Sequence, residues 1–293
     1  MKKTKEKIPP KAKKQKNPPR SQWVQNALNN PVRDYHVYVM TAFERSLYFV
    51  LAFVVGGLVS QVFYGGLFQR DGMATTLTYI SSVAVFIIVG LVAARFFLPM
   101  RNEQLLRKSQ LDLRSQFRDM LESITAALSA NDTVPQAFDY AWKSMKLQYS
   151  ENAYIVQELG HICEAISNNY PLIDAIEDLA SRSACEDIES FSNVFRACYG
   201  PGGNMKEVMR QTHDIICDKM KIEDEIRSKI SANQLELNII TVAPILIVGM
   251  LRFSGGSFAE NFASPAGVIS ITIAIILFIV AYRMGQKIVN IKG

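Results

Sequence analysis

Two histidine–cysteine pairs are the side chains of this sequence that could hold a metal ion. His213 and Cys217 are four residues apart, so they would share one face of a helix and could form half of a zinc site. His161 and Cys163 could in principle complete that site. The sequence has three histidines and lacks a pattern of carboxylates that would orient metal-binding imidazoles. We therefore expect ordinary packing for these residues, and we predict no metal and no cofactor.

Acidic side chains form a second group near the middle of the chain. The members are Asp174, Glu177, Asp178, Glu186, Asp187 and Glu189. The first three would lie on one helix, and the other three follow shortly after it. A divalent cation site is one interpretation, but a solvated face or a docking surface for a basic partner fits such a charge cluster better. We take the docking surface as the working hypothesis.

Sequence motifs of the common enzyme classes are missing. The chain has no GxxxxGK[ST] phosphate loop, no HExxH zinc helix and no GxSxG nucleophile elbow. The cluster Gly200-Pro201-Gly202-Gly203 lacks the lysine and the preceding strand of a phosphate site, so it indicates a hinge between helices. No CxxC pair occurs among the four cysteines, which predicts free thiols in a reducing compartment. They are Cys163, Cys185, Cys198 and Cys217. The sequence favours a protein that is not an enzyme.

Helices must position these residues, because the central region has helical periodicity and almost no strand signal. A first long helix would bury one apolar face. Its members are Leu113, Phe117, Met120, Leu121, Ile124 and Leu128. Asn131-Asp132 would end that helix, and Thr133–Gln136 is typical of a capping box with proline in the first turn. Further helices are expected over roughly 151–166, from Pro171 onward, and over 186–198.

Two stretches without glycine or proline predict unusually long helices. Asn204–Ala243 would run from the central region into the third apolar segment, and Met100–Val134 would leave the second one. We infer two helical stalks that connect a soluble bundle to the membrane.

Four apolar segments are candidates for membrane spans. They are Leu47–Phe68, Thr75–Ala94, Leu237–Leu251 and Pro265–Tyr282. The third is short and would have to extend to Phe253 to cross the bilayer. Steps of four between Ala52, Gly56 and Ser60, and between Gly90 and Ala94, suit close packing of the helices. The expected fold class is all-α, with two N-terminal and two C-terminal transmembrane helices flanking a cytoplasmic six-helix bundle.

Positive charge near the apolar segments predicts their orientation. The links between paired spans hold only Arg70 and Arg252, whereas 1–45, 95–118 and the C-terminal end carry most of the lysine and arginine. By the positive-inside rule both termini and the central domain would be cytoplasmic, in a multi-pass inner-membrane protein. A cleaved signal peptide is not expected, because the first apolar run begins too late and is too long.

Charge is unevenly distributed along the expected domains. Met1–Arg20 carries nine Lys/Arg and one acid, whereas Arg95–Gln234 carries sixteen Lys/Arg and twenty-one acids. The basic stretch Lys2–Lys16 predicts a disordered arm on anionic lipid head groups, with contact to an acidic partner or RNA as the alternative. A nucleic-acid-binding domain is not expected. The expected divisions are a basic, largely disordered arm and juxtamembrane segment (1–45), a transmembrane hairpin (46–98), a helical domain (99–234), a second hairpin (235–284) and a cytoplasmic tail (285–293).

This order of parts resembles the type II secretion system F-domain family, in particular the shorter Tad/Flp pilus platform proteins of the TadB/TadC kind. The resemblance covers roughly Leu111–Ile291. It depends on the helix openings TVPQAFDYA (133–141) and YPLIDAIEDLA (170–180), and on the restart GPGGNMKEVM (200–209). The chain departs from the family at Asn131-Asp132-Thr133, where a glycine-containing turn is common, and in its longer basic N-terminal arm.

The resemblance implies an inner-membrane assembly platform that couples a cytoplasmic hexameric secretion ATPase to insertion of pilin subunits into a filament, for a pilus or a secretion machine. Prepilins or pilins, the ATPase, membrane lipids and a paralogous platform protein in an oligomer would be its partners. Three alternatives stay open: a transporter or channel component with a helical regulatory domain, a membrane-tethered enzyme, and a membrane-tethered signalling adaptor. The first predicts polar residues lining a pathway in the spans, and these are scarce.

Overall fold

The computed structural model describes residues 21–26, 28–65, 76–200, 204–253 and 264–291. The predicted basic arm at Lys2–Lys16 and most of the glycine-rich hinge therefore lie outside the described residues. Within these ranges the chain forms eight helices and one short β-hairpin. The elements are β1 Trp23–Gln25, β2 Pro31–Arg33, α1 Ala42–Tyr64, α2 Thr76–Ser129, α3 Val134–Gln148, α4 Tyr154–Ser167, α5 Leu172–Ser183, α6 Glu186–Cys198, α7 Met205–Phe253 and α9 Pro265–Ile291. The predicted all-helical class is confirmed.

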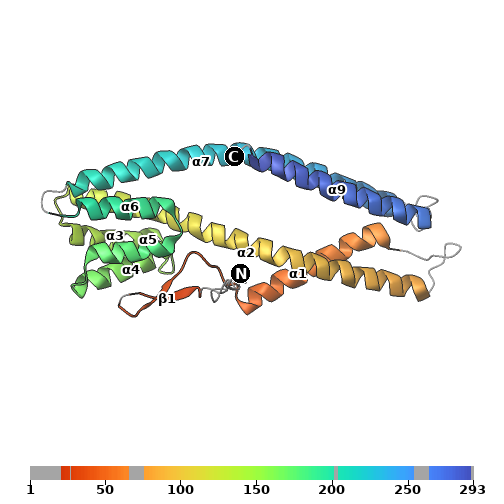
Figure 1. Cartoon of the computed structure of the whole chain (residues 1–293), viewed down its shortest axis with the longest axis horizontal. Coiled ribbons are helices and arrows are strands. Elements are labelled where there is room, and N and C mark those ends of the chain that lie inside the picture. Colours follow the sequence, from red (N-terminus) through yellow and green to blue (C-terminus); the bar gives the residue numbers. More distant parts are fainter. Residues whose placement is uncertain (1–20, 27, 66–75, 201–203, 254–263, 292–293) are drawn as a thin grey trace, which may run out of the picture.

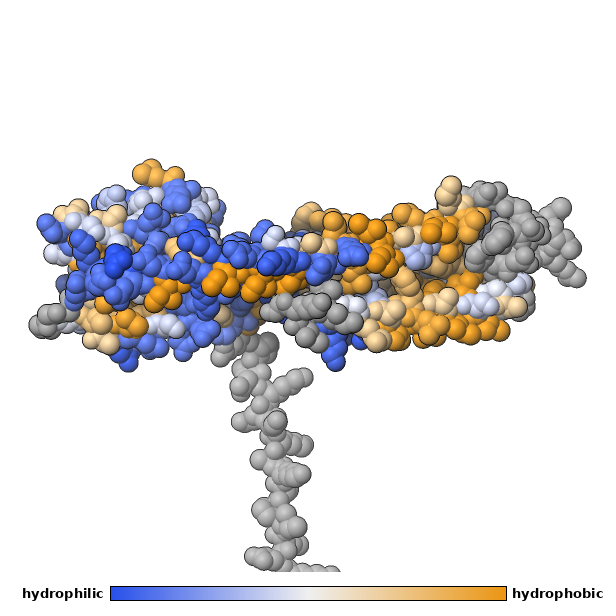
Figure 2. Space-filling model, turned by 90° about the horizontal axis from the view of Figure 1, so that it is seen from above, coloured by the Kyte–Doolittle hydropathy of each residue, from blue (hydrophilic) through white to orange (hydrophobic). Residues whose placement is uncertain are grey.

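The molecule is elongated, with a group of packed helices at one end and four apolar helical segments at the other (Figure 1). These segments belong to α1, α2, α7 and α9, and each is long and apolar enough to cross a membrane. Figure 2 shows the same division as a hydrophilic end and a hydrophobic end. The arrangement is that of a multi-pass membrane protein with a polar domain outside the bilayer.

Small residues allow α1 and α2 to pack closely as an antiparallel pair. Ala52 and Ala94 are buried between the helices. A methyl group added at Gly56 would lie 2.6 Å from Cβ of Ala93, and one added at Gly90 would lie 2.8 Å from the carbonyl oxygen of Phe53. The predicted close contact at these positions is confirmed.

Two helices connect the packed domain to the apolar end without interruption. α2 contains 54 residues and α7 contains 49, so at 1.5 Å per residue they are about 80 and 75 Å long. A bilayer core of about 30 Å leaves some 45 to 50 Å of each helix outside the membrane. The expectation of unbroken helices through 100–129 and through 205–243 is confirmed, and α2 stays helical across Pro99 as well.

The packed domain is built from the second half of α2, the first part of α7 and the short helices α3 to α6 (Figure 1). Its centre is a group of interlocking aromatic rings. Phe117 packs edge-on against Phe191 at 5.3 Å between centroids, and Phe195 packs against both Phe138 and Tyr199. These rings come from α2, α3 and α6, so the apolar faces of separate helices meet in one core.

Local sequence signals set most of the helix ends in this domain. α2 ends before Asn131, which adopts a left-handed conformation with φ of 70°, and α3 begins with the capping box of Thr133 and Gln136. α6 spans the predicted residues 186–198. The prediction for α4 was wrong by three residues, because Ser150–Ala153 form a turn closed by a 2.9 Å backbone hydrogen bond and the helix begins at Tyr154.

The N-terminal region holds an element that the sequence did not predict. β1 and β2 form an antiparallel hairpin in which Val24 pairs with Val32. Residues 34–41 then lead from the hairpin to the N-cap of α1 at Thr41. Residues 28–41 fall within the expected arm and juxtamembrane segment (1–45), and in the structure Val32 and Tyr35 are buried, with Tyr35 part of the core of the helical domain.

Candidate partner-docking site

A groove between α5 and α6 brings part of the acidic cluster together. Its volume is about 540 Å³. The lining residues are His36, Glu177, Ala180, Ser181, Ala184, Cys185, Glu186, Glu189, Ser192, Asn193 and Arg196. The left-handed conformation of Ala184, with φ of 51°, lets the chain turn directly from α5 into α6. We call this surface the α5–α6 groove.

Three of the predicted docking residues line this groove. Glu186 and Glu189 lie in the first turn of α6 and are exposed, and the side chain of Glu186 is 86% accessible. Carboxylates at this position are favoured by the partial positive charge of the helix N-terminus. Glu177 lies on the opposite wall and forms an ion pair with Arg196 across the groove. The groove is therefore negative at its α6 rim and neutralised at its centre.

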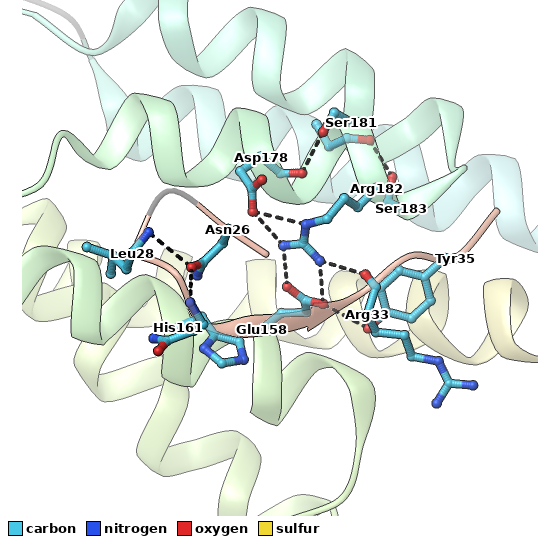
Figure 3. A network of polar contacts seen from close by, with 12 residues as sticks. Asn26, Leu28, Arg33, Tyr35, Glu158, His161, Asp178, Ser181, Arg182 and Ser183 are labelled. Carbon is cyan, nitrogen blue, oxygen red and sulfur yellow. Dashed lines mark hydrogen bonds and ion pairs between the residues drawn. The ribbon is translucent and has the colours of Figure 1, made fainter. Parts of the chain in front are cut away.

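Asp178 is directed away from the groove into a polar network inside the domain (Figure 3). Its Oδ2 accepts hydrogen bonds from Nε and Nη2 of Arg182, at 3.0 and 2.8 Å. The same guanidinium donates to both carboxylate oxygens of Glu158, at 3.0 and 2.9 Å. Arg182 and Glu158 are buried, so Asp178 helps to neutralise an arginine within the fold.

Asp187 is likewise held by cations of its own chain. Its carboxylate forms an ion pair with Arg114 of α2 and accepts a 2.8 Å hydrogen bond from Nζ of Lys219 of α7. Arg114 also pairs with Glu223 of α7. The Asp187 side chain is only 10% exposed. It joins α6 to both long helices, which leaves little of the carboxylate for a partner.

Asp174 completes the predicted set. It is exposed in the first turn of α5 and does not line the α5–α6 groove. The structure thus divides the six predicted residues into three that line the groove, two that stabilise the fold, and one that stands apart on the surface. Glu186 and Glu189 are the exposed groove carboxylates.

The N-terminal segment 28–41 packs beside this site through Tyr35, which the sequence did not identify. The Tyr35 hydroxyl donates a 3.0 Å hydrogen bond to Glu158, and its backbone N–H donates to the carbonyl of Arg182 at 2.9 Å. Nε2 of Gln110 donates to the Tyr35 carbonyl at 2.9 Å. Burial and the neighbouring Glu158 carboxylate raise the pKa of Tyr35, so the phenol stays protonated and acts as a donor.

Further contacts hold the same segment to α4 and α5. Arg182 donates to the carbonyl of Arg33 at 2.7 Å, and the Arg33 guanidinium lies 4.8 Å from the ring centre of Tyr154. Asn30 donates to Glu164 at 2.8 Å. His36, at the end of this run, lines the α5–α6 groove. The segment therefore forms part of one wall of the site.

The histidine and cysteine pairs are partly brought together. Sγ of Cys217 lies 3.4 Å from Nε2 of His213, as expected for residues one helical turn apart. His161 is on α4, with Nδ1 at 3.9 Å from Glu164. Within the described residues no group of three His, Cys, Asp or Glu is placed to hold a metal ion.

Three of the four thiols should react slowly at neutral pH, because their pKa values are raised. Burial raises the pKa of the Cys163 thiol to about 12, and it also raises the pKa of Cys185 and Cys217. A nucleophilic cysteine needs the opposite shift, because the thiolate is the reactive form. The raised pKa therefore argues against a nucleophilic role for these three cysteines.

Comparison of the chain with protein-family models, with curated proteins and with solved structures gave no match.

Proposed function

We propose that this protein is an inner-membrane assembly platform of a Tad/Flp-type pilus or a related secretion machine. In this proposal a hexameric secretion ATPase binds the helical domain on the cytoplasmic side. Its conformational cycle moves the membrane helices, which deliver pilin subunits to a growing filament. A paralogous platform protein would complete the oligomer in the membrane.

The observation that carries the proposal is the continuity of α2 and α7. Each is a single helix that begins or ends in the packed domain and extends into the apolar end. Each helix continues through one internal proline, Pro99 in α2 and Pro244 in α7, where one backbone hydrogen bond is lost and a bend is expected. The chain nevertheless stays helical on both sides of each proline, so a displacement at one end can reach the other. Two such connections suit a protein that passes a displacement from one domain to the other.

The network around Arg114 supports coupled movement of the two long helices. Arg114 of α2 pairs with Glu223 of α7 and with Asp187 of α6. The Arg114 and Asp187 side chains are each 10% exposed, so water screens their interaction only weakly. A force applied to α6 would therefore act on both α2 and α7.

The α5–α6 groove supplies a surface on which a motor protein could act. Its exposed carboxylates, Glu186 and Glu189, favour a basic segment of the partner. Asp187 lies between them in the sequence and makes the ion pair that leads into the long helices. Docking and force transmission would thus use adjacent residues of one helix turn.

The main rival is a transporter component, which should have a polar pathway between its membrane helices. The hollow between α1, α2, α7 and α9 has a volume of about 660 Å³, and in the described part of the chain no charged side chain lines it. Its serine hydroxyls are engaged locally, with Ser60 donating to the Gly57 carbonyl and Ser270 to that of Ala266. This lining favours the platform over an ion pathway.

Co-purification from membranes tests the proposal. The full-length protein would be isolated with a co-expressed secretion ATPase as the wild type and as the variants E186K/E189K and E122K/E151K. Glu122 and Glu151 are exposed on the same domain outside the groove, so the second variant makes the same change in charge elsewhere. We expect the ATPase to be lost, by at least about tenfold, from E186K/E189K alone.

Two results would count against the proposal. Equal recovery of the ATPase with all three forms would remove the α5–α6 groove as its docking site. Failure of the wild type to bind any secretion ATPase, or protease accessibility that places residues 110–200 outside the cell, would remove the platform itself.

A further inference from the structure

A hollow lies where α1 and α2 diverge, on the side of the packed domain. The two helices are in close contact at Gly56 and Gly90. They diverge toward the start of α1 (Figure 1). The opening between them has a volume of about 980 Å³. Its lining residues are Tyr38, Val39, Met40, Arg45, Phe49, Leu91, Val92, Arg95, Phe96, Leu98, Pro99 and Asn102.

Two arginines from different helices face this hollow without an acidic partner. Arg45 is in the second turn of α1, and Arg95 directly follows the apolar stretch of α2. Neither side chain makes an ion pair or hydrogen bond with any residue that the structure describes. By contrast, Arg101 one and a half turns further along α2 donates to Tyr48 and Gln104. The hollow therefore carries two uncompensated positive charges.

The acidic residues closest in sequence are engaged elsewhere. The Glu44 carboxylate accepts a 3.0 Å hydrogen bond from the backbone N–H of Thr41 and completes the cap of α1. Glu103 pairs with Arg107 at 2.7 Å. Neither of these acids lines the hollow. Arg45 and Arg95 are both exposed, so water solvates them when the hollow is empty, and both can pair with an anion from outside the chain.

The chemical character of the lining changes along the helix axes. Phe49, Leu91 and Val92 lie on the side of the apolar segments, one helical turn deeper than the two arginines. Tyr38 and Asn102 lie on the side of the packed domain and offer hydroxyl and amide groups. The outward side also holds apolar residues, namely Val39, Met40, Phe96, Leu98 and Pro99. The hollow thus has an apolar end toward the membrane, two arginines next to it, and a mixed outer side, as expected near the boundary between acyl chains and head groups.

We propose that this hollow is a binding site for one anionic phospholipid. The phosphate would lie between the guanidinium groups of Arg45 and Arg95, which suit bidentate hydrogen bonds to phosphate oxygens. An acyl chain would follow Phe49, Leu91 and Val92 toward the bilayer centre. The uncharged remainder of a glycerol head group would meet Tyr38 and Asn102. Nothing in this site depends on the proposed role in filament assembly.

Charge selects the lipid class. A zwitterionic lipid would add a quaternary or primary ammonium group to a site that already has two unpaired cations. Phosphatidylglycerol carries the phosphate without that extra positive charge. Each arginine near the membrane surface should strengthen the binding of an anionic lipid by about a factor of five. Loss of both should therefore weaken the binding roughly thirtyfold.

Native mass spectrometry of the full-length protein tests the site. The wild type and R45Q/R95Q would be transferred from detergent into an equimolar mixture of phosphatidylglycerol and phosphatidylcholine. The lipid that stays bound to each protein would then be identified by its mass. R283Q/K287Q is the matched control, because it removes two exposed charges near the end of α9. We expect retention of phosphatidylglycerol by the wild type and by the control, with a roughly thirtyfold loss in R45Q/R95Q.

Three outcomes would contradict the proposed lipid site, and further variants cover the case in which R45Q/R95Q does not fold. Equal retention by the wild type and R45Q/R95Q would overturn the proposal, and so would equal retention of the two lipids. Displacement of phosphatidylglycerol by millimolar glycerol phosphate would assign the arginines to a soluble anion instead. If R45Q/R95Q does not fold, R45Q and R95Q singly should each lose about fivefold, while R45K/R95K should keep the lipid preference.

Discussion

Breaking the ion pair between Glu158 and Arg182 should destabilise the helical domain strongly. The two side chains are 3% and 8% exposed and meet through two hydrogen bonds of 3.0 and 2.9 Å. Replacing Glu158 by glutamine keeps the shape of the side chain but removes its charge. Arg182 would then depend on Asp178 alone for a counter-charge.

The expected magnitude follows from the remaining contacts. Loss of one partner from a buried ion pair costs about 3–5 kcal/mol. Asp178 and the Arg33 carbonyl stay in contact with the guanidinium, so the lower end of that range, about 3 kcal/mol, applies to E158Q. In a domain of this size such a loss lowers the melting temperature by roughly 10 °C. R182M should cost a similar amount, because Glu158 then keeps only the Tyr35 hydroxyl.

Thermal unfolding of the full-length protein in detergent would measure these changes. Trp142 is a suitable probe, since its indole N–H donates to the Val156 carbonyl at 3.2 Å and its ring lies against Gly160 of α4. A W23F background removes the other tryptophan. The double variant E158Q/R182M completes a mutant cycle, and we expect a coupling free energy of about 2 kcal/mol.

Additive effects would refute this reasoning. If the double variant loses the sum of the two single losses to within about 0.5 kcal/mol, the two groups do not stabilise each other. A loss below about 1 kcal/mol for E158Q would show that the carboxylate is not needed as a buried counter-charge.

Other residues of the same chain give independent tests. Y35A should expose the N-terminal segment, so that trypsin cuts after Arg33 at least about tenfold faster. Y35F loses only the hydrogen bond to Glu158, so it should cost about 1.5–3 kcal/mol of stability without rapid cleavage. Equal cleavage of both variants would contradict the anchoring role. G90A should lower the melting temperature in detergent through overpacking of about 1–3 kcal/mol, because the new methyl group would meet the Phe53 carbonyl oxygen at 2.8 Å. G249A is its control, with 3.6 Å to the Val62 side chain, and equal effects would exclude a tight crossing at Gly90. The pKa of the Cys163 thiol is raised to about 12, so at pH 8 its thiolate fraction should be roughly a thousandfold lower than that of a thiol of pKa 9.0. The rate of its alkylation in the folded protein should therefore rise about tenfold per pH unit from 8 to 11. Mass spectrometry after iodoacetamide treatment would measure this, with the urea-unfolded chain as reference, and a rate independent of pH would contradict the shift.

Helix identity and helix ends were predictable because their causes are local. Thr133 and Gln136 carry the complete capping box within four residues, and Asn131 can adopt the left-handed conformation that ends α2. The apolar segments are equally explicit in composition. The start of α4 was missed because the choice between a turn and a first helical turn at Ser150–Ala153 depends on packing as well as on local residue preference.

The candidate site was predicted less well, because its residues are defined by partners far away in the sequence. Asp187 is held by Arg114, which is 73 residues distant, and Tyr35 reaches Glu158 over 123 residues. No local pattern encodes such pairs. The link between Asp178 and Arg182 could have been found, since an acid and a base four residues apart on a helix commonly pair. The hairpin was missed because strands of three residues leave almost no periodicity.

The anchored N-terminal segment has a mechanical consequence. The helical domain meets the membrane helices at three places, through α2, through α7 and through the short run from Tyr35 to the start of α1 at Ala42. A body on two supports can rock about the line that joins them, and a third connection restricts that motion. A tilt of the domain about α2 and α7 would therefore load the run from Tyr35 to Ala42 and the hydrogen bond between Tyr35 and Glu158.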